Sequence, residues 1–200
     1  WGENLRRSGF EVTVALHRAT GPSYERARDA GFDPLTLDAL ASALEHDPNP
    51  VAFVAMLTPD AEIGAIYARS LRAVKRPLSI VLAHGYAVYA SELVELAPGH
   101  EPALLAPKAI GPKLEAAHRE ALPGSHKLVA AFASSPERAS ALELIAAGLG
   151  FAKDNLVPAT FEQEAIGDLI SEQALLCGGV FSLIQWTLEE MKRAGVPERL

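Results

Sequence analysis

Residues 51–85 read VAFVAMLTPDAEIGAIYARSLRAVKRPLSIVLAHG, and this stretch decides the fold. It opens with an apolar, β-branched run at 51–57, continues as a helical pattern over about 61–74, and closes on a second apolar run at 78–83. Both runs are apolar on both faces, which is typical of strands in a parallel sheet that helices cover on two sides. The stretch therefore predicts a strand–helix–strand unit of an α/β fold.

Similar units extend the pattern on either side of this stretch. Further strands are expected at 10–16, 103–106 and 127–132, and further helices at about 24–30, 36–45 and 136–148. Alternation of this kind predicts a doubly wound α/β domain with a parallel sheet. Ligands of such domains bind beyond the carboxyl ends of the strands.

The pattern changes after Val157. Residues 161–193 read as nearly continuous helix, with a break or kink expected near Gly178 and Gly179, and no strand follows. We therefore expect a domain boundary here, with the α/β domain at 1–157 and the beginning of a helical domain at 158–200.

Composition limits the classes of function. The chain has 200 residues, is 49% hydrophobic and carries a net charge of -7, which is ordinary for a globular protein. The acidic balance and the lack of a basic cluster argue against nucleic acid as a partner. No uninterrupted apolar run reaches about 18 residues, so no membrane partner is expected. The single cysteine, Cys177, leaves no internal disulfide and suits a reducing cytoplasm.

Three carboxylates share one face of the long helix. Glu164, Asp168 and Glu172 stand four residues apart, and each step of four leaves a drift of about 40° around an α-helix. Like charges at this spacing repel one another, and burial among apolar neighbours would add to the cost. Mg²⁺ takes carboxylate oxygens and would relieve both effects. A solvated acidic stripe is the alternative, and spacing alone does not choose between them.

The loop after the first expected strand offers cations and hydroxyl groups but no acid. In dinucleotide-binding folds an acid at this place selects NAD, whereas a basic residue accommodates the 2′-phosphate of NADP. A plain polar turn is the alternative. The candidate cofactor ligands here are His17, Arg18, Thr20 and Ser23.

Polar residues also follow three later strands. The segment Leu57-Thr58-Pro59-Asp60 ends one strand and opens a helix, so Asp60 either contacts a ligand or is only a first-turn acid. His84 and Gly85 end the next strand, and Lys108 follows the one after it. A structural histidine and a solvated lysine are the alternatives.

Taken in order, these segments resemble the ketol-acid reductoisomerase (acetohydroxyacid isomeroreductase) family. The resemblance covers essentially the whole chain, and its last segment is long and specific. The matching motifs are Asn4-Leu5-Arg6-Arg7-Ser8-Gly9, Ala83-His84-Gly85-Tyr86, Ala106-Pro107-Lys108, Asp168-Leu169-Ile170-Ser171-Glu172-Gln173 and Leu176-Cys177-Gly178-Gly179.

The resemblance implies a Rossmann-like NADPH-binding domain followed by an all-helical, knotted domain. It implies two Mg²⁺ ions, migration of an alkyl group in 2-acetolactate or 2-aceto-2-hydroxybutyrate, and reduction of the product by NADPH, in valine and isoleucine synthesis. It also implies a homodimer or larger assembly whose active site is completed across subunits. The expected compartment is the cytoplasm, or a plastid or mitochondrion in a eukaryote.

The resemblance also assigns roles to residues. Asp168 and Glu172 would bind metal, while His84, Lys108 and Glu164 would be catalytic. The residues that would contact the cofactor are His17, Arg18, Thr20, Ser23, Leu57, Pro59, Asp60 and Gly85.

The chain departs from the family pattern in several places. The family's glycine-rich phosphate loop and first strand would precede Trp1, and further acidic ligands would follow Leu200. Ala87, the pair Ala109-Ile110 and Ile63 replace family residues in loops near the cofactor or substrate. These changes keep alternatives open: a divergent NADP-dependent reductase of another hydroxy- or keto-acid, a catalytically impaired paralogue, or a non-enzymatic nucleotide-binding module.

Overall fold

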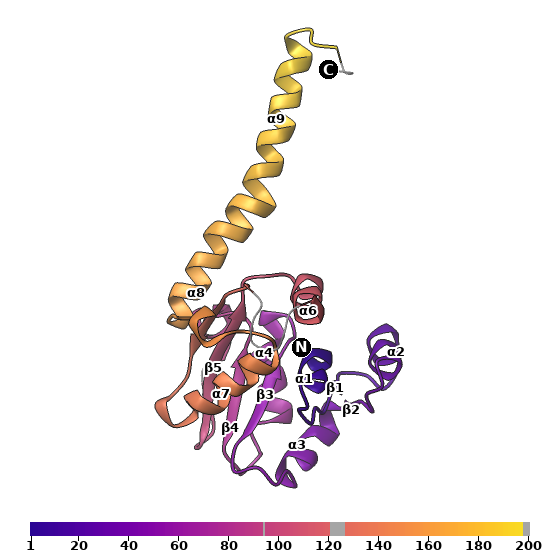
Figure 1. Ribbon diagram of the computed structural model, residues 1–200, viewed down its shortest axis with the longest axis vertical. Coiled ribbons are helices and arrows are strands. Elements are labelled where there is room, and N and C mark those ends of the chain that lie inside the picture. Colours follow the sequence, from indigo (N-terminus) through magenta and orange to yellow (C-terminus); the bar gives the residue numbers. More distant parts are fainter. Residues whose placement is uncertain (94, 121–126, 198–200) are drawn as a thin grey trace.

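The computed structural model describes residues 1–93, 95–120 and 127–197. It shows an α/β body from which one long helix projects (Figure 1). The elements in chain order are α1 (Gly2–Arg7), β1 (Ala15–Leu16), α2 (Pro22–Asp29), β2 (Leu35–Thr36), α3 (Leu37–Glu45), β3 (Ala52–Met56), α4 (Asp60–Ser70), β4 (Leu78–Leu82), α5 (Tyr86–Tyr89), β5 (His100–Pro107), α6 (Gly111–Glu120), β6 (Ala130–Ala133), α7 (Pro136–Gly148), the 3₁₀ helix η1 (Lys153–Asn155), β7 (Leu156–Pro158), α8 (Phe161–Asp168), the π-helix η2 (Leu169–Gly179) and α9 (Val180–Arg193).

The main sheet has five strands in the order β3-β4-β5-β6-β7. The pairs β3–β4, β4–β5 and β6–β7 are parallel, which confirms the predicted α/β class. The pair β5–β6 is antiparallel, so the expectation of a uniformly parallel sheet was wrong at this one step. A strand buried on both faces has the same apolar pattern in either direction, and mixed sheets of this kind are common. The sequence therefore gave no signal for the reversal.

Strands β1 and β2 form a separate two-stranded parallel sheet. A strand was expected over 10–16, but only Ala15 and Leu16 pair as strand. Strand β7 was not expected, although its first two residues are apolar. Its three residues are too few to show a period, so the sequence could not separate them from a loop.

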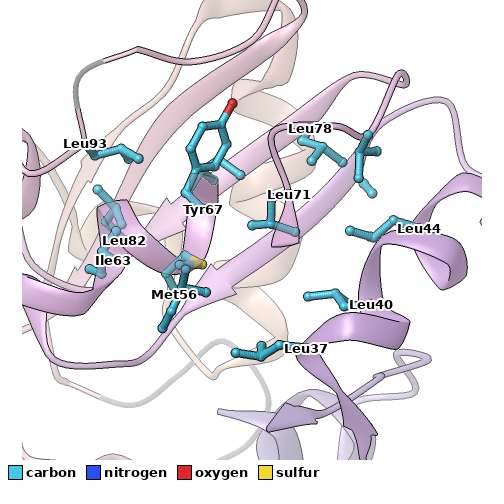
Figure 2. Close-up of a cluster of buried hydrophobic side chains, with 14 of the residues drawn as sticks. Leu37, Leu40, Leu44, Met56, Ile63, Tyr67, Leu71, Leu78, Leu82 and Leu93 are labelled. Carbon is cyan, nitrogen blue, oxygen red and sulfur yellow. The ribbon is translucent and has the colours of Figure 1, made fainter. Parts of the chain in front are cut away.

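Two apolar cores lie on the two faces of the main sheet. One packs α3, α4 and α5 against the sheet, and alternate residues of β4 point into it (Figure 2). The other packs α6 and α7 against the opposite face, with Val81, Leu105, Leu142 and Phe151 among its buried members. The sheet is the middle layer between these two cores, so β4 is buried on both faces. Its carboxyl end at Leu82 leads to His84.

The carboxyl-terminal helix extends from Phe161 to Arg193 and leaves the α/β body as a rod (Figure 1). A continuous helix was expected here, and a break was expected at Gly178 and Gly179. Instead the backbone changes from α to π winding over Leu169–Gly179 and returns to α winding without interruption. π-Helical segments are rare and are frequently found at functional sites.

This helix is also long and apolar enough to cross a membrane, by length and composition only. The expectation of no membrane partner rested on the lack of an uninterrupted apolar run. That lack does not exclude a helix of this length and composition. Glu164, Asp168 and Glu172 lie in its amino-terminal half, and Glu164 is hydrogen-bonded to His84, Gly85 and Lys108 of the α/β body. The exposed apolar side chains along the helix include Ile170, Leu175, Leu176, Phe181, Leu183, Ile184, Trp186 and Leu188.

Candidate functional site

The site begins with the turn that opens α8. Thr160 accepts a hydrogen bond on Oγ1 from the Gln163 backbone N–H at 3.1 Å, and Gln163 Oε1 accepts one from the Thr160 N–H at 2.9 Å. This reciprocal capping box satisfies two donors that the first turn would otherwise leave unpaired. It fixes the start of the helix, and Glu164 lies one residue beyond Gln163, pointing back to the sheet.

Gly85 allows α8 to approach the end of β4. A Cβ at this position would lie 2.2 Å from the Phe161 carbonyl oxygen and 3.0 Å from Glu164 Oε2. Real Cβ atoms do not approach so closely, so a side chain at Gly85 would push the helix away. Instead the Gly85 backbone N–H donates to Glu164 Oε2 at 2.5 Å.

Four side chains from three elements meet at this place. Glu164 Oε2 accepts a hydrogen bond from His84 Nδ1 at 2.7 Å, and Glu164 Oε1 accepts one from Lys108 Nζ at 2.5 Å. Asp168 Oδ1 lies 3.2 Å from Lys108 Nζ, and Asp168 Oδ2 lies 3.6 Å from His84 Nε2. The result is a ring in which acidic and basic groups alternate, and we refer to His84, Lys108, Glu164 and Asp168 as the charged cluster.

Glu164 is the buried centre of the charged cluster, with a side chain only 1% exposed. Burial alone would raise the pKa of its carboxyl group. The hydrogen bonds from His84, Lys108 and Gly85 outweigh that effect and lower the pKa to about 2. Glu164 is therefore an anion at all physiological pH values, held by three donors.

The pKa values of the two basic groups, His84 and Lys108, are both raised. The hydrogen bond to Glu164 raises the pKa of His84, against the opposing effect of burial, and the charges of Glu164, Asp168 and Asp60 add to the rise. Burial lowers the pKa of Lys108, but its bonds to Glu164 and Asp168 outweigh burial, so the pKa is raised overall. The charged cluster thus favours the cationic forms of both His84 and Lys108.

A cavity of about 300 Å³ opens on one side of His84, between the ends of β3 and β4. Leu57, Pro59 and Asp60 line it together with His84 and Ile63. Asp60 is the first residue of α4, and burial raises the pKa of its carboxyl group, with the His84 charge opposing the rise. The structure therefore brings three of the predicted cofactor contacts, Leu57, Pro59 and Asp60, to one cavity at the carboxyl ends of the strands.

A second cavity, of about 410 Å³, lies on the other side of the charged cluster. Lys108, Glu164 and Asp168 line it, as do Gly167 and Ser171. Glu164 and Lys108 thus separate the hollow beside His84 from the one beside Asp168.

Other predicted residues lie apart from these cavities. His17, Arg18 and Thr20 are exposed on the loop between β1 and α2, whereas Ser23 is exposed in the first turn of α2 and accepts a hydrogen bond from Arg26. Within the described part of the chain, the acids and histidines whose ligand atoms lie within 4.8 Å of one another are His84, Glu164 and Asp168. Glu172 is outside this group, because the expected spacing assumed α winding and the backbone is π-wound from Leu169 on.

The donor set fits a hard divalent cation only in part. Asp168 offers carboxylate oxygens at the rim of the second cavity, with a side chain 14% exposed, and Ser171 adds a hydroxyl group nearby. Oxygen donors of this kind are what Mg²⁺ prefers. Glu164 is less suitable, because its two oxygens already accept bonds from three donors. A magnesium ion would thus be held through Asp168, with Glu172 four residues along the same helix.

Two residues near the charged cluster were not singled out from the sequence. Tyr86 stacks on His84 with ring centroids 6.1 Å apart and an interplanar angle of 21°. Ser171 lines the second cavity beside Asp168. Tyr86 directly follows the His84-Gly85 pair and Ser171 lies in the Asp168–Gln173 motif, so motif membership was the signal that could have found both.

Known proteins resemble the chain over most of its length. The model of the family described as "Acetohydroxy acid isomeroreductase, NADPH-binding domain" matches residues 1–154. The ketol-acid reductoisomerase (NADP(+)) of Xanthomonas campestris pv. campestris (strain B100) is 34% identical over 194 residues, which are 96% of this chain and 55% of that protein. The chain thus spans about half the length of the curated relatives it matches.

Solved structures show the same relationship. An NADH-preferring ketol-acid reductoisomerase from an uncultured archean superposes with a TM-score of 0.77 at 27% identity, over 98% of this chain and 58% of that one. A structure from Jannaschia sp. CCS1 superposes with a TM-score of 0.69 at 17% identity, over 99% of this chain and 71% of that one, and shares the fold alone. On the family match and the curated identity, the chain belongs to the ketol-acid reductoisomerase (acetohydroxy acid isomeroreductase) family.

Proposed function

We propose that the protein is an NADPH-dependent ketol-acid reductoisomerase. In this reaction an alkyl group migrates within 2-acetolactate or 2-aceto-2-hydroxybutyrate, and the rearranged keto acid is then reduced. The single observation that carries the proposal is the charged cluster. Through Glu164 it joins His84, Lys108 and Asp168, which come from three separate family motifs, at the carboxyl ends of the strands.

Each member of the charged cluster has a physical role in the proposal. Glu164 is a positioning residue that orients His84 and Lys108 through hydrogen bonds of 2.7 Å and 2.5 Å. His84 faces the first cavity and holds a proton near the ligand. Lys108 faces the second cavity and places a positive charge beside the substrate's oxygen atoms.

Magnesium, when bound, supplies a Lewis acid that polarises substrate oxygens. Asp168 is the residue of this chain that would hold it, and Glu172 would add a further carboxylate. Ser171 lies on the same wall as Asp168 and would orient water or substrate there. Further ligands would come across the interface of a dimer or larger assembly in the cytoplasm.

NADPH is proposed as the reductant because the matching family model is that of an NADPH-binding domain. The first cavity, lined by Leu57, Pro59 and Asp60, would take the end of the cofactor next to His84. Arg18 and His17 are exposed and free of nearby acid in their loop, which suits a 2′-phosphate. The archaean relative is named as NADH-preferring, so the assay should compare both cofactors.

The test is steady-state oxidation of NADPH by the protein at its natural length, with Mg²⁺ and two substrates in parallel. One is 2-acetolactate, which needs both migration and reduction, and the other is the rearranged 3-hydroxy-2-keto acid, which needs reduction only. The proposal predicts turnover of both. Turnover of neither would overturn it, as would oxidation with the rearranged acid alone.

One observation favours a second candidate, a reductase of another hydroxy- or keto-acid. Ile63 lines the first cavity and is only 2% exposed, so a purely apolar side chain stands where the family pattern has glutamine. Such a wall could not hydrogen-bond a ligand's polar edge. This candidate predicts NADPH oxidation with a panel of 2-keto acids and no consumption of 2-acetolactate.

A further inference from the structure

The charged cluster contains an unequal pair of contacts at one ammonium group. Lys108 Nζ lies 2.5 Å from Glu164 Oε1, on a side chain only 1% exposed. The same nitrogen lies 3.2 Å from Asp168 Oδ1, on a side chain 14% exposed. The bond to Glu164 is the shorter and more buried of the two, so it is the harder to break.

Lys108 and a divalent cation need the same carboxylate. Asp168 lines the second cavity, and its Oδ1 already contacts Lys108. A unit positive charge 3.2 Å from Asp168 Oδ1 repels a divalent cation bound to the same carboxylate and lowers its affinity. The affinity of Asp168 for a cation therefore depends on where the Lys108 ammonium group lies.

We propose that Lys108 is a counter-cation that competes with the divalent metal for Asp168, pivoting on Glu164 so that metal binding turns the ammonium group away from Asp168. The proposal rests on the proposed function, because it takes Asp168 as a metal ligand. It adds that Lys108 sets the metal affinity. The pivot is Glu164, which His84 and the Gly85 N–H hold in place from the other side.

The pivot has room to operate. The side chain of Lys108 is 33% exposed and lines the second cavity of about 410 Å³, so the ammonium group can turn away from Asp168 without entering the apolar core. Glu164 keeps its other two donors during this movement. The burial cost of its charge is thus still offset when Lys108 turns.

The first experiment is calorimetric titration of Mg²⁺ into the protein at its natural length, comparing wild type with Lys108→Met and Lys108→Arg. The matched control is Lys75→Met, which removes the same charge at an exposed position before β4, at the opposite edge of the sheet. Lys108→Met should bind Mg²⁺ roughly tenfold more tightly than wild type, because a competing unit charge at about 3 Å is gone. Lys108→Arg and Lys75→Met should stay within about twofold of wild type. Equal or weaker binding by Lys108→Met would overturn the proposal.

A second measurement does not depend on the variant's folding. The Lys108 amine of the wild type is acylated with an N-hydroxysuccinimide ester, and the modified peptide is quantified by mass spectrometry, with Lys75 as the internal standard. Labelling of Lys108 should rise as Mg²⁺ saturates the protein, while labelling of Lys75 should stay constant. Labelling of Lys108 that is unchanged or falls with Mg²⁺ would overturn the proposal.

Failure of this inference is distinguishable from failure of the proposed function. If Asp168→Asn binds Mg²⁺ as tightly as wild type, Asp168 is not a metal ligand and the metal part of the proposed function fails. If Asp168→Asn weakens binding but Lys108→Met does not strengthen it, only the competition by Lys108 fails.

Discussion

His84 Nδ1 donates a hydrogen bond of 2.7 Å to Oε2 of Glu164, although 80 residues separate the two in sequence. His84 follows the buried strand β4, whereas Glu164 belongs to the first turn of α8. The contact therefore ties the projecting carboxyl-terminal helix to the carboxyl end of β4. It also sets the charge of the histidine, because an anion at this distance favours the imidazolium form.

Replacing Glu164 with Gln should destabilise the fold and leave His84 and Lys108 without their shared anion. The loss in the free energy of unfolding should be about 2 kcal/mol, because the amide cannot accept from Lys108 and the Gly85 N–H equally well. Urea denaturation checks the change. Glu162→Gln, an exposed acid in the same turn, is the control and should change stability by less than about 0.5 kcal/mol. Equal stability of the two variants would contradict the central position given to Glu164.

Low pH should destabilise the fold because it protonates Glu164. The pKa of Glu164 is about 2 in the folded chain and 4.5 in the unfolded one, so its contribution is present above pH 4.5 and is lost as pH falls toward 2. A difference of about 2.5 units corresponds to an order of 3 kcal/mol. Urea unfolding at a series of pH values should show wild type losing more stability than Glu164→Gln across this window. Parallel curves would show that Glu164 is not the group responsible.

The contribution of His84 to stability should depend on pH in the opposite direction to that of Glu164. Its pKa is raised above 6.5 in the folded chain, so its stabilising contribution is fully present below 6.5 and is lost as pH rises through the folded value. An NMR titration of the His84 ring should place its midpoint above the ordinary value of 6.5. In Glu164→Gln the His84 midpoint should fall. A midpoint that does not respond to this substitution would contradict the hydrogen bond.

Gly85→Ala should disturb the site more than a glycine substitution elsewhere. The new Cβ would lie 2.2 Å from the Phe161 carbonyl oxygen, so α8 must shift, at an expected cost of about 2 kcal/mol. Gly111→Ala is the matched control, because its Cβ would meet no heavy atom within 4 Å among the described residues. Thermal unfolding of both variants tests this, and equal melting temperatures would contradict the close packing of α8 on the end of β4.

Thr160→Ala should weaken the start of α8. The substitution removes the oxygen that accepts from the Gln163 N–H, and loss of such a cap costs about 1 kcal/mol. Thr13→Ala, at an exposed position outside the helices and strands, is the control. Chemical denaturation should separate the two variants. If both match wild type, the capping box does not contribute to the placement of Glu164.

The sequence predicted the α/β class because β3, α4 and β4 have clear apolar periods. It could not predict the direction of β6, since a strand that is buried on both faces has the same apolar pattern in either direction. It placed His84 and Lys108 at one edge from the rule that ligand residues follow strand ends, whereas only the family resemblance brought Asp168, on its helix, to the same site. The π winding after Asp168 left no periodic signal, and for that reason Glu172 was expected closer to the charged cluster than it lies.

The most direct test of the account is Mg²⁺-dependent oxidation of NADPH with 2-acetolactate by wild type and Asp168→Asn, at natural chain length. Asp154→Asn, an exposed acid in η1, is the matched control. The account predicts turnover by wild type and Asp154→Asn, and a loss of at least about a hundredfold in Asp168→Asn, as expected when a catalytic electrostatic group is removed. Turnover by Asp168→Asn equal to that of wild type would contradict it.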